Sequence, residues 1–325
     1  MRTENLDEPV RTIETARQNR QSNVITREMY WEVIRTKLRV LSELNEIAER
    51  ENLTIRITPQ DLELEIPLKE FKTSIKMFLN VEDIRSAPFS IIAEGPYEAF
   101  QANLLFKLGQ QSKEFLDIGA NMGYYTLGMP RINPDLKVHS FEPQPVTYKT
   151  LVRNLELNSL SGNVTTHNCG LGAENSVLTM FIPRFTGSGG GSFANLHVEE
   201  GEPEVFETPV YSLDKYLDSQ SAPDLVKVDV EGFEFEVMLG GQETVSRNKP
   251  TIVIELLRKW MKPFGRHPQD VIDLLVPRGY LVYSIQENGL EAIRIIDDST
   301  IETNFLFIHE ENQKHFGVID RFVRV

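Results

Sequence analysis

The stretch from Glu114 to Thr126, E-F-L-D-I-G-A-N-M-G-Y-Y-T, constrains the fold of this chain more than any other. A short apolar run leads to Asp117, and Gly119 and Gly123 follow at a spacing of four residues. The next apolar run, V-H-S-F-E, ends in Glu142. This pattern predicts a strand, a tight turn, a helix and a second strand that ends in a carboxylate. It is typical of a βαβ unit that binds a nucleotide-type ligand.

The residues of the turn favour one sign of ligand charge. A dinucleotide site has the pattern G-x-G-x-x-G, whereas this chain has Asn121 where a glycine is usual. The Asp117 carboxylate is expected to face the place that a phosphate would occupy, where it repels anions and attracts cations. S-adenosylmethionine fits because it carries a sulfonium and an amino group, and Glu142 is expected to accept hydrogen bonds from its ribose. The alternative is that Gly119 and Gly123 only make a tight turn.

Composition excludes several classes of function. The chain has 325 residues and a net charge of −14, which argues against nucleic acid as a partner and weakens a case for anionic membranes. The lone cysteine, Cys169, excludes an internal disulfide and suits a reducing compartment. No apolar run approaches the roughly 20 residues of a membrane span, and the polar N-terminus does not resemble a secretory signal. We therefore expect a soluble, cytoplasmic protein.

The first part of the chain is expected to be an appended α+β extension. Residues 1–22 are polar and are predicted to form a flexible lead. Residues 23–85 are predicted to hold a helix over 26–52, a hairpin, and a helix-like run over 68–80. The first helix has an apolar stripe that serves either as a homo-oligomer seam or for packing on its own subunit. The stripe consists of Ile34, Leu38, Leu41, Leu44 and Ile47.

Residues 86–112 are predicted to link this extension to the main domain and to cover the cofactor site. Glu94 and Tyr97 precede a helix-like run that ends near Leu108, and they are candidates for the mouth of the site. The alternative is that both are plain surface residues.

From residue 113 to 325 apolar strand runs alternate with helix-like runs, which predicts a doubly wound, mostly parallel, seven-stranded sheet. Ligands of such sheets bind outside the carboxyl ends of the strands. This rule places Asp117, Glu142, Asp229 and Glu255 along one edge. Regularity fails over 183–209. The glycine-rich part of that stretch, residues 187–195, is either a substrate-side lid or an insertion of no consequence.

Five motifs together indicate a family. They are L-D-I-G-A-N-M-G-Y-Y-T-L, F-E-P-Q-P, S-L-D-K-Y-L, K-V-D-V-E-G-F-E and I-V-I-E, in this order. Over residues 115–307 the chain resembles the FkbM family of S-adenosylmethionine-dependent methyltransferases. The resemblance implies a class I methyltransferase fold, which is Rossmann-like. It also implies O-methylation of a hydroxyl on a small molecule, sugar or other glycan, with S-adenosylhomocysteine as the product.

The resemblance also assigns site residues. The acidic pair of the D-V-E-G block falls on Asp229 and Glu231, and the ribose-binding acid on Glu142. Gly170 lies where such enzymes border the adenine, although Cys169 and Gly170 depart from the usual Ala-Leu. The cofactor loop falls on Asp117, Gly119, Asn121 and Gly123.

Methyl transfer to a hydroxyl benefits from a general base. The candidates are Asp229, Glu231 and Glu255, and we favour Asp229 because it ends the strand beside the cofactor strand. The alternative for Asp229 is a structural role in capping the following turn. The same three acids are also the candidate ligands of a magnesium ion. His267 precedes a helix and is a further candidate for the base, and the alternative is that it is a surface residue or caps that helix.

Residues 260–264 are expected to matter either for acceptor binding or for packing. Trp260, Met261 and Phe264 follow the fifth strand, and they form either the apolar wall of an acceptor pocket or part of the core. Two other functions compete with methyl transfer. One is an NAD-dependent oxidoreductase, which the missing third glycine and Asp117 disfavour. The other is a non-catalytic, cofactor-binding partner subunit that assembles through the N-terminal helix.

Overall fold

The computed structural model describes residues 13–22, 24–58, 61–160, 162–184, 187–217 and 220–324. The chain divides into two compact units, Met1–Ile55 and Arg56–Val325. This division comes earlier in the chain than the linker that we predict at residue 86. Helix α1 (Ile13–Gln21) occupies part of the stretch predicted as a flexible lead, and residues 1–12 of that lead lie outside the described residues.

The first unit is built on the long helix α2 (Arg27–Glu51), which agrees with the helix predicted over 26–52. Thr26 caps its start by accepting a hydrogen bond from the Met29 backbone N–H at 3.1 Å. Within the predicted apolar stripe, Leu38 and Leu41 are 51% and 47% exposed. The homo-oligomer seam on this helix stays a prediction.

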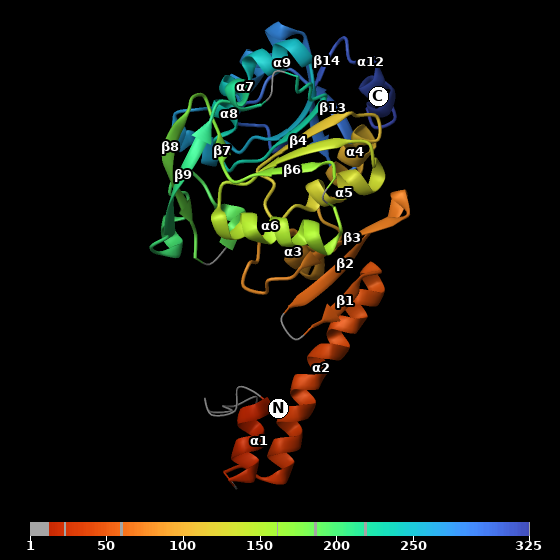
Figure 1. The fold of residues 1–325 in the computed structure, drawn as a ribbon, viewed down its shortest axis with the longest axis vertical. Helices are drawn as coiled ribbons and strands as arrows, with labels where there is room; N and C mark the ends of the chain where they lie inside the picture. Colours follow the sequence, from red (N-terminus) through yellow and green to blue (C-terminus); the bar gives the residue numbers. More distant parts are fainter. Residues whose placement is uncertain are drawn as a thin grey trace. The chain divides into compact units, whose positions relative to one another are not determined.

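The second unit contains an eight-stranded sheet in the order β13-β12-β14-β11-β10-β4-β5-β6 (Figure 1). The five strands from β11 to β6 are parallel, and β14 runs antiparallel to both of its neighbours. The sequence order along the sheet reverses between β4 and β10. The strands are β4 (Glu114–Ile118), β5 (Lys137–Phe141), β6 (Val164–His167), β10 (Leu225–Val228), β11 (Thr251–Glu255), β12 (Tyr280–Gln286), β13 (Gly289–Ile293) and β14 (Asn304–His309).

The predicted doubly wound, mostly parallel sheet is confirmed. Each of the seven predicted apolar runs forms a strand of this sheet. The eighth strand, β13, was not predicted because G-L-E-A-I is short and only partly apolar. It is held in place by antiparallel pairing with β12.

Helices lie on both faces of this sheet (Figure 1). One group packs through α4, α5 and α12, and the other through α7, α8, α9 and α11. The helix-like residues 235–245 belong to two helices, α8 and α9, which meet at Gly241. The helices of this unit are α3 (Ala87–Glu94), α4 (Ala99–Gly109), α5 (Tyr124–Ile132), α6 (Pro145–Leu157), α7 (Leu213–Tyr216), α8 (Glu234–Gly240), α9 (Gln242–Asn248), α10 (Arg258–Met261), α11 (Pro268–Leu275) and α12 (Gln313–Ile319).

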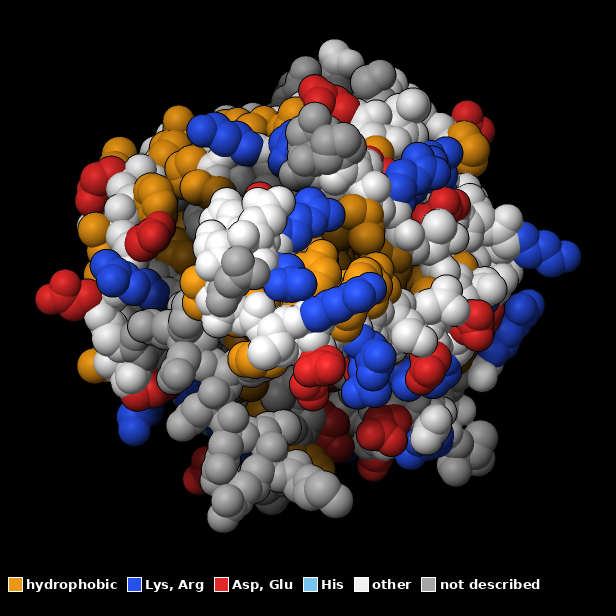
Figure 2. Space-filling model, turned by 90° about the horizontal axis from the view of Figure 1, so that it is seen from below, with side chains coloured by type: hydrophobic (Ala, Val, Ile, Leu, Met, Phe, Trp, Pro, Cys, Tyr) orange, Lys and Arg blue, Asp and Glu red, His pale blue; other side chains and the backbone are white. Residues whose placement is uncertain are grey.

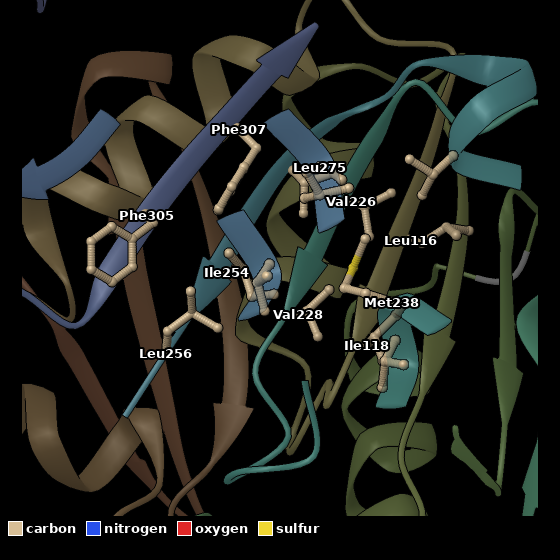
Figure 3. Close-up of a cluster of buried hydrophobic side chains, with 14 of the residues drawn as sticks. Leu116, Ile118, Val226, Val228, Met238, Ile254, Leu256, Leu275, Phe305 and Phe307 are labelled. Carbon is tan, nitrogen blue, oxygen red and sulfur yellow. The ribbon is translucent and has the colours of Figure 1, made fainter. Parts of the chain in front are cut away.

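The two faces of the central strands differ in polarity. Alternate residues of β4 and β10, such as Leu116, Val226 and Val228, join a buried apolar cluster (Figure 3). Each such side chain stabilises the fold by about 1.5–3 kcal/mol through burial. The intervening residues point to the other face, and there Asp117 pairs in register with Lys227. Two ionisable side chains are thereby placed side by side in the middle of the sheet.

Two predictions of local structure are wrong, for the same reason. Residues 73–78 form strand β3 and not a helix, because they pair with β2 (Leu62–Leu68) in a sheet ordered β1-β2-β3. Part of the stretch predicted as irregular, 183–209, belongs to strand β9 (Glu204–Tyr211), which pairs with β7 (Gly170–Leu171) and β8 (Ser176–Ile182). In both cases pairing with a distant segment overrides the local pattern. Strand β1 is Thr54–Ile57.

Strand β3 is tied to the loop that follows β4. The Asn154 side chain accepts a hydrogen bond from the Phe78 backbone N–H at 2.9 Å and donates one to the Met122 carbonyl at 2.8 Å. Asn154 itself is fully buried. One side chain of α6 therefore fixes the glycine turn against a neighbouring sheet. Among the described helices, none combines the length and the apolar character needed to cross a bilayer.

Candidate active site

A cavity of about 400 Å³ opens at the carboxyl ends of β4 and β10, where the strand order reverses. Its volume is in the range of small-molecule and cofactor sites. Its wall includes eight of the ten residues singled out from the sequence. These are Glu94, Gly119, Asn121, Glu142, Gly170, Asp229, Glu231 and Glu255, and the other two, Asp117 and Gly123, lie behind it.

The glycine turn forms the floor between β4 and α5. Gly119 has a φ of +82°, and a Cβ atom built on it would lie 1.8 Å from the Asp229 carbonyl oxygen. No other residue fits there without moving the backbone of the adjacent loop. Gly123 has a φ of +95° and caps the N-terminus of α5. The turn therefore holds the start of α5 close to the end of β10.

Glu142 is fixed by backbone donors. Its two carboxylate oxygens accept hydrogen bonds from the Asn121 and Gln144 N–H groups, both at 2.9 Å. The side chain is 5% exposed, and burial raises its pKa to about 7. Each carboxylate oxygen keeps a lone pair for a further donor, so the group is placed to accept hydroxyl hydrogen bonds in the cavity.

Asp117 does not lie where we predicted it. It is 1% exposed and sits beneath the cavity, where its Oδ2 accepts a hydrogen bond from Thr126 Oγ1 at 2.6 Å. The carboxylate is one residue before the end of β4, so its side chain packs against α5 and does not face outward. Asp117 therefore does not line the cavity, and the positive charge of the neighbouring Lys227 offsets its negative charge.

The end of the cavity beyond Glu142 is lined by small and apolar groups. Gly170 lies against the Phe193 ring, since a Cβ atom on it would approach that ring to 2.8 Å. Cys169 is buried, and burial raises the pKa of its thiol to about 11. The thiol is therefore protonated at neutral pH. The glycine-rich segment reaches the cavity through Gly191, Ser192 and Phe193, which fits a substrate-side position.

Glu94 and Tyr97, from the segment before α4, lie in the cavity wall. Two further residues take part. Tyr125 donates a hydrogen bond to Glu98, which also accepts one from Gln101 at 2.9 Å. Burial raises the pKa of both Glu98 and Tyr125. The phenol groups of Tyr97 and Tyr125 and the carboxyl group of Glu98 therefore lie in the same wall of the cavity.

Asp229 follows β10 and lies between two partners. The Lys227 Nζ donates to its Oδ2 at 2.9 Å, and Glu255 forms a hydrogen bond with it from the end of β11. Burial, followed by the charges of Asp229 and Glu231, raises the pKa of Glu255 to about 10. Glu255 is therefore protonated at neutral pH and donates to Asp229.

Glu231 occupies a strained position in the same loop. Its φ is +56°, which is uncommon for a residue with a side chain. Ser192 Oγ donates to its backbone carbonyl at 2.7 Å. Its Oε2 is buried and has no hydrogen-bond partner within the described structure. Burial and the charge of Asp229 raise its pKa. A strained backbone and an unsatisfied oxygen in a cavity wall mark a position suited to a ligand.

The three aromatic and apolar candidates after β11 lie in three different environments. Trp260 lines the cavity, Met261 is fully buried in the core, and Phe264 packs against Phe233 with ring centroids 5.2 Å apart. His267 is the N-cap of α11, as predicted, and its Nδ1 accepts from the Gln269 N–H at 3.1 Å.

The prediction of a magnesium site is not supported. Within the described residues, no three His, Cys, Asp or Glu side chains are arranged to hold a metal ion. Asp229 is instead occupied by Lys227 and Glu255.

The cavity wall is rich in carboxyl groups. On the face shown in Figure 2, Asp and Glu side chains are interspersed with Lys and Arg. The cavity wall instead combines six carboxyl groups with the cations Lys227 and Arg85. Burial raises the pKa of Glu98, Glu142, Glu231 and Glu255, whereas Lys227 lowers that of Asp229, so Asp229 is the carboxylate that this wall holds ionised. The six groups are Glu94, Glu98, Glu142, Asp229, Glu231 and Glu255.

Sequence reasoning missed several residues of this wall, of which Lys227, Glu98 and Arg85 carry charge. A signal for Lys227 was present: a lysine inside a buried apolar strand, two residues before an aspartate, lies on the same face as that aspartate. Glu98 and Arg85 come from loops outside the βαβ pattern, and nothing in their local sequence marks them.

The strand order, the switch point and the glycine turn define a class I methyltransferase fold. A family model described as the methyltransferase FkbM domain matches residues 117–282, slightly more than half of the chain. The chain therefore belongs to the FkbM methyltransferase domain family, as its motifs predicted.

Curated relatives carry methyltransferase names. "Methyltransferase 1" of Beauveria bassiana (strain ARSEF 2860) is 32% identical over 158 residues, which are 43% of this chain and 63% of that protein. "Methyltransferase sdnD" of Sordaria araneosa is 30% identical over 198 residues, 51% of this chain and 72% of that protein. The chain thus spans less than two thirds of the length of the first relative. A solved FkbM methyltransferase from Methylobacillus flagellatus KT is 18% identical, with a TM-score of 0.41, covering 70% of this chain and 55% of that one.

Proposed function

We propose that this protein uses S-adenosylmethionine to methylate a hydroxyl group of a small molecule or sugar. The observation that carries the proposal is the cavity at the switch point. There the glycine turn, Glu142 and Asp229 line one cavity. Membership of the FkbM family supports it, as does the ionised Asp229 in the cavity wall, which favours a sulfonium cation.

The residues of the cavity fit this cofactor. Glu142 is held by two backbone N–H groups with lone pairs left for ribose hydroxyls. Gly170 and Phe193 offer a small and flat surface for a base. When bound, S-adenosylmethionine supplies an electrophilic methyl group, which passes to the acceptor oxygen as its bond to sulfur breaks. The same lining disfavours a pyrophosphate, and hence an NAD-dependent oxidoreductase.

Asp229 is the residue that we assign as general base. It is ionised, 22% exposed in its side chain, and located at the edge of the cavity between β4 and β11. It takes the proton of the acceptor hydroxyl as the new bond to carbon forms. Trp260 and the free oxygen of Glu231 lie on the side where the acceptor would bind.

Calorimetry tests the cofactor assignment directly. S-adenosylhomocysteine should bind, and NAD should give no heat. The absence of binding by S-adenosylhomocysteine would overturn the proposal.

The variant Asp229→Asn tests the base. It should bind S-adenosylhomocysteine as the wild type does and lose about 10²–10⁴-fold in turnover, because removal of a positioned base costs that much. The measurement is the formation of S-adenosylhomocysteine with a panel of hydroxylated small molecules and sugars. Asp224→Asn is the matched control, since Asp224 precedes the opposite end of β10 and pairs with Lys314. Turnover that survives in Asp229→Asn would place the base elsewhere.

A further inference from the structure

Lys227 is a buried cation with one close hydrogen-bond partner. It lies in β10 among apolar residues, and 4% of its surface is exposed. Its Nζ donates to Asp229 Oδ2 at 2.9 Å. Lysine is almost never fully buried unless it is paired, because an isolated ammonium is costly to remove from water. The buried charge of Lys227 is thus placed beside Asp229, the carboxylate that we assign as base.

The surroundings of Lys227 hold it in the charged form. Asp117 is its direct neighbour on β4, and its Nζ lies 5.2 Å from the centre of the Tyr125 ring. Burial lowers the pKa of Lys227, but the charges of Asp229, Asp117 and Glu98 outweigh burial and raise it above its ordinary value. Lys227 is therefore an ammonium that donates, and it is not itself a proton acceptor.

Asp229 experiences opposite influences from its two partners. Burial raises the pKa of Asp229, and the nearby ammonium of Lys227 more than offsets this, so that the net pKa is below the ordinary value. Glu255 holds its own proton and donates to Asp229. Without the ammonium, the adjacent buried carboxyl groups of Asp229 and Glu255 would compete for one proton, and the pKa of Asp229 would no longer be clearly the lower of the two.

We propose that Lys227 is a positioning residue that keeps Asp229 ionised and aimed into the cavity, so that Asp229 and not Glu255 accepts the acceptor's proton. In the step, the acceptor O–H bond breaks, its proton passes to Asp229, and the oxygen forms the bond to carbon. Lys227 and Glu255 keep their protons throughout. This inference rests on the proposed function.

The other ionisable groups around this pair come from several elements, and they are mostly acidic. Among the described residues of this wall, Lys227 is therefore the main positive charge close to Asp229. The groups that face Lys227 or Asp229 are Glu98 before α4, Asp117 on β4, Tyr125 on α5, Tyr97, Glu142, Glu231, Glu234 and Glu255.

The variant Lys227→Met tests the inference without knowledge of the acceptor. The side-chain carboxyl carbons of aspartate are labelled with ¹³C, and the signal of Asp229 is assigned by its loss in Asp229→Asn. In the wild type Asp229 should stay ionised from pH 5 to 8. In Lys227→Met its titration midpoint should rise by about one pH unit or more, into that range. A midpoint that does not move would overturn the inference.

Two variants separate charge from packing. Lys227→Arg keeps the cation, so Asp229 should remain ionised over the same range. Lys314→Met removes the lysine of the surface pair with Asp224 and should leave the Asp229 signal unchanged. If Lys227→Met does not fold, the wild type alone decides, because an Asp229 that is protonated at pH 5–8 contradicts the inference.

The failure of this inference is distinguishable from that of the proposed function. Calorimetry with S-adenosylhomocysteine on the same samples reports on the cofactor site. If the wild type does not bind S-adenosylhomocysteine, the proposed function is overturned, but the titration of Asp229 can still be interpreted. Intact binding together with an unmoved midpoint in Lys227→Met would overturn only the role of Lys227.

Discussion

The two sides of the cavity hold their buried carboxylates in different ways. On the side that we assign to the cofactor, Glu142 accepts two backbone hydrogen bonds at 2.9 Å. The donors are Asn121 in the glycine turn and Gln144. On the acceptor side, Asp229 depends on side chains, Lys227 at 2.9 Å and a protonated Glu255. Burial acts on both, yet it raises the pKa of Glu142 to about 7, whereas Lys227 lowers that of Asp229.

This difference separates anchoring from chemistry. Backbone donors are fixed by the fold, so a carboxylate that they hold is suited to recognising an invariant part of a ligand. Side-chain partners can carry full charge and can exchange protons, so they set the protonation state of a reacting group. Under the proposed function, Glu142 therefore anchors the cofactor and Asp229 takes part in proton transfer.

The largest effect that would break this arrangement is expected for Gly119→Ala. A Cβ atom there would meet the Asp229 carbonyl at 1.8 Å, and the φ of +82° adds backbone strain. Both sides of the cavity should be displaced at once. We expect a loss of several kcal/mol in the free energy of unfolding, measured by urea titration, and loss of S-adenosylhomocysteine binding by calorimetry.

Gly317→Ala is the control for Gly119→Ala. It lies in α12 with no atom within 4 Å of the added Cβ, and it should stabilise the fold by up to about 1 kcal/mol. A Gly119→Ala protein that is as stable as the wild type would show that the two loops are not in contact.

An intermediate effect is expected from the pH dependence that Glu142 contributes. Its folded-state pKa is raised from 4.5 to about 7, so the folded chain binds its proton more tightly than the unfolded chain does. Stability from this group is therefore greatest below pH 4.5 and falls as the pH rises to 7. The loss is about 3 kcal/mol, at about 1.4 kcal/mol per unit of pKa.

The difference in unfolding free energy between the wild type and Glu142→Gln isolates this contribution. It should change by about that amount between pH 4.5 and 7.5, to the disadvantage of the wild type, because other groups titrate equally in both proteins. The exposed Glu174→Gln variant should show no such change. A pH-independent difference for Glu142→Gln would mean that backbone donors keep this carboxylate ionised throughout.

The smallest effect is expected for Cys169→Ala. The thiol lines the cavity, is buried, and has a pKa of about 11, so it carries no charge at neutral pH. Its loss should cost about 1 kcal/mol of stability and change the affinity for S-adenosylhomocysteine little. Urea titration and calorimetry measure the two. Complete loss of turnover with binding intact would instead assign a chemical role to Cys169.

The sequence predicts the cofactor side of the site better than the acceptor side. Gly119, Asn121 and Glu142 belong to one βαβ unit, and their relative positions follow from local spacing. The row formed by Asp117 and Lys227 depends on the register of two strands that are more than 100 residues apart in the chain. Spacing alone cannot supply that register, so the pairing of Asp117 with Lys227 could not be predicted.

The same physical limit explains the errors in the fold. The strand β3 and the strand β9 each exist because a partner strand satisfies their backbone groups, and neither carries an apolar run of the kind that marks β4 or β10. The substrate-side role of the glycine-rich segment stays a prediction. Its contact with the cavity through Ser192, whose hydroxyl binds the Glu231 carbonyl, could not be inferred from composition.

The close approach of Gly119 to the Asp229 carbonyl has a consequence for how this enzyme family can diverge. Two loops that touch backbone to backbone leave no slack between them, so neither can shift without the other. Under the proposed function, new acceptors are accommodated by exchanging side chains at the rim, such as Trp260 and Arg85, while the two loops keep their contact. The distance from the transferred carbon to Asp229 is then the quantity that the scaffold protects.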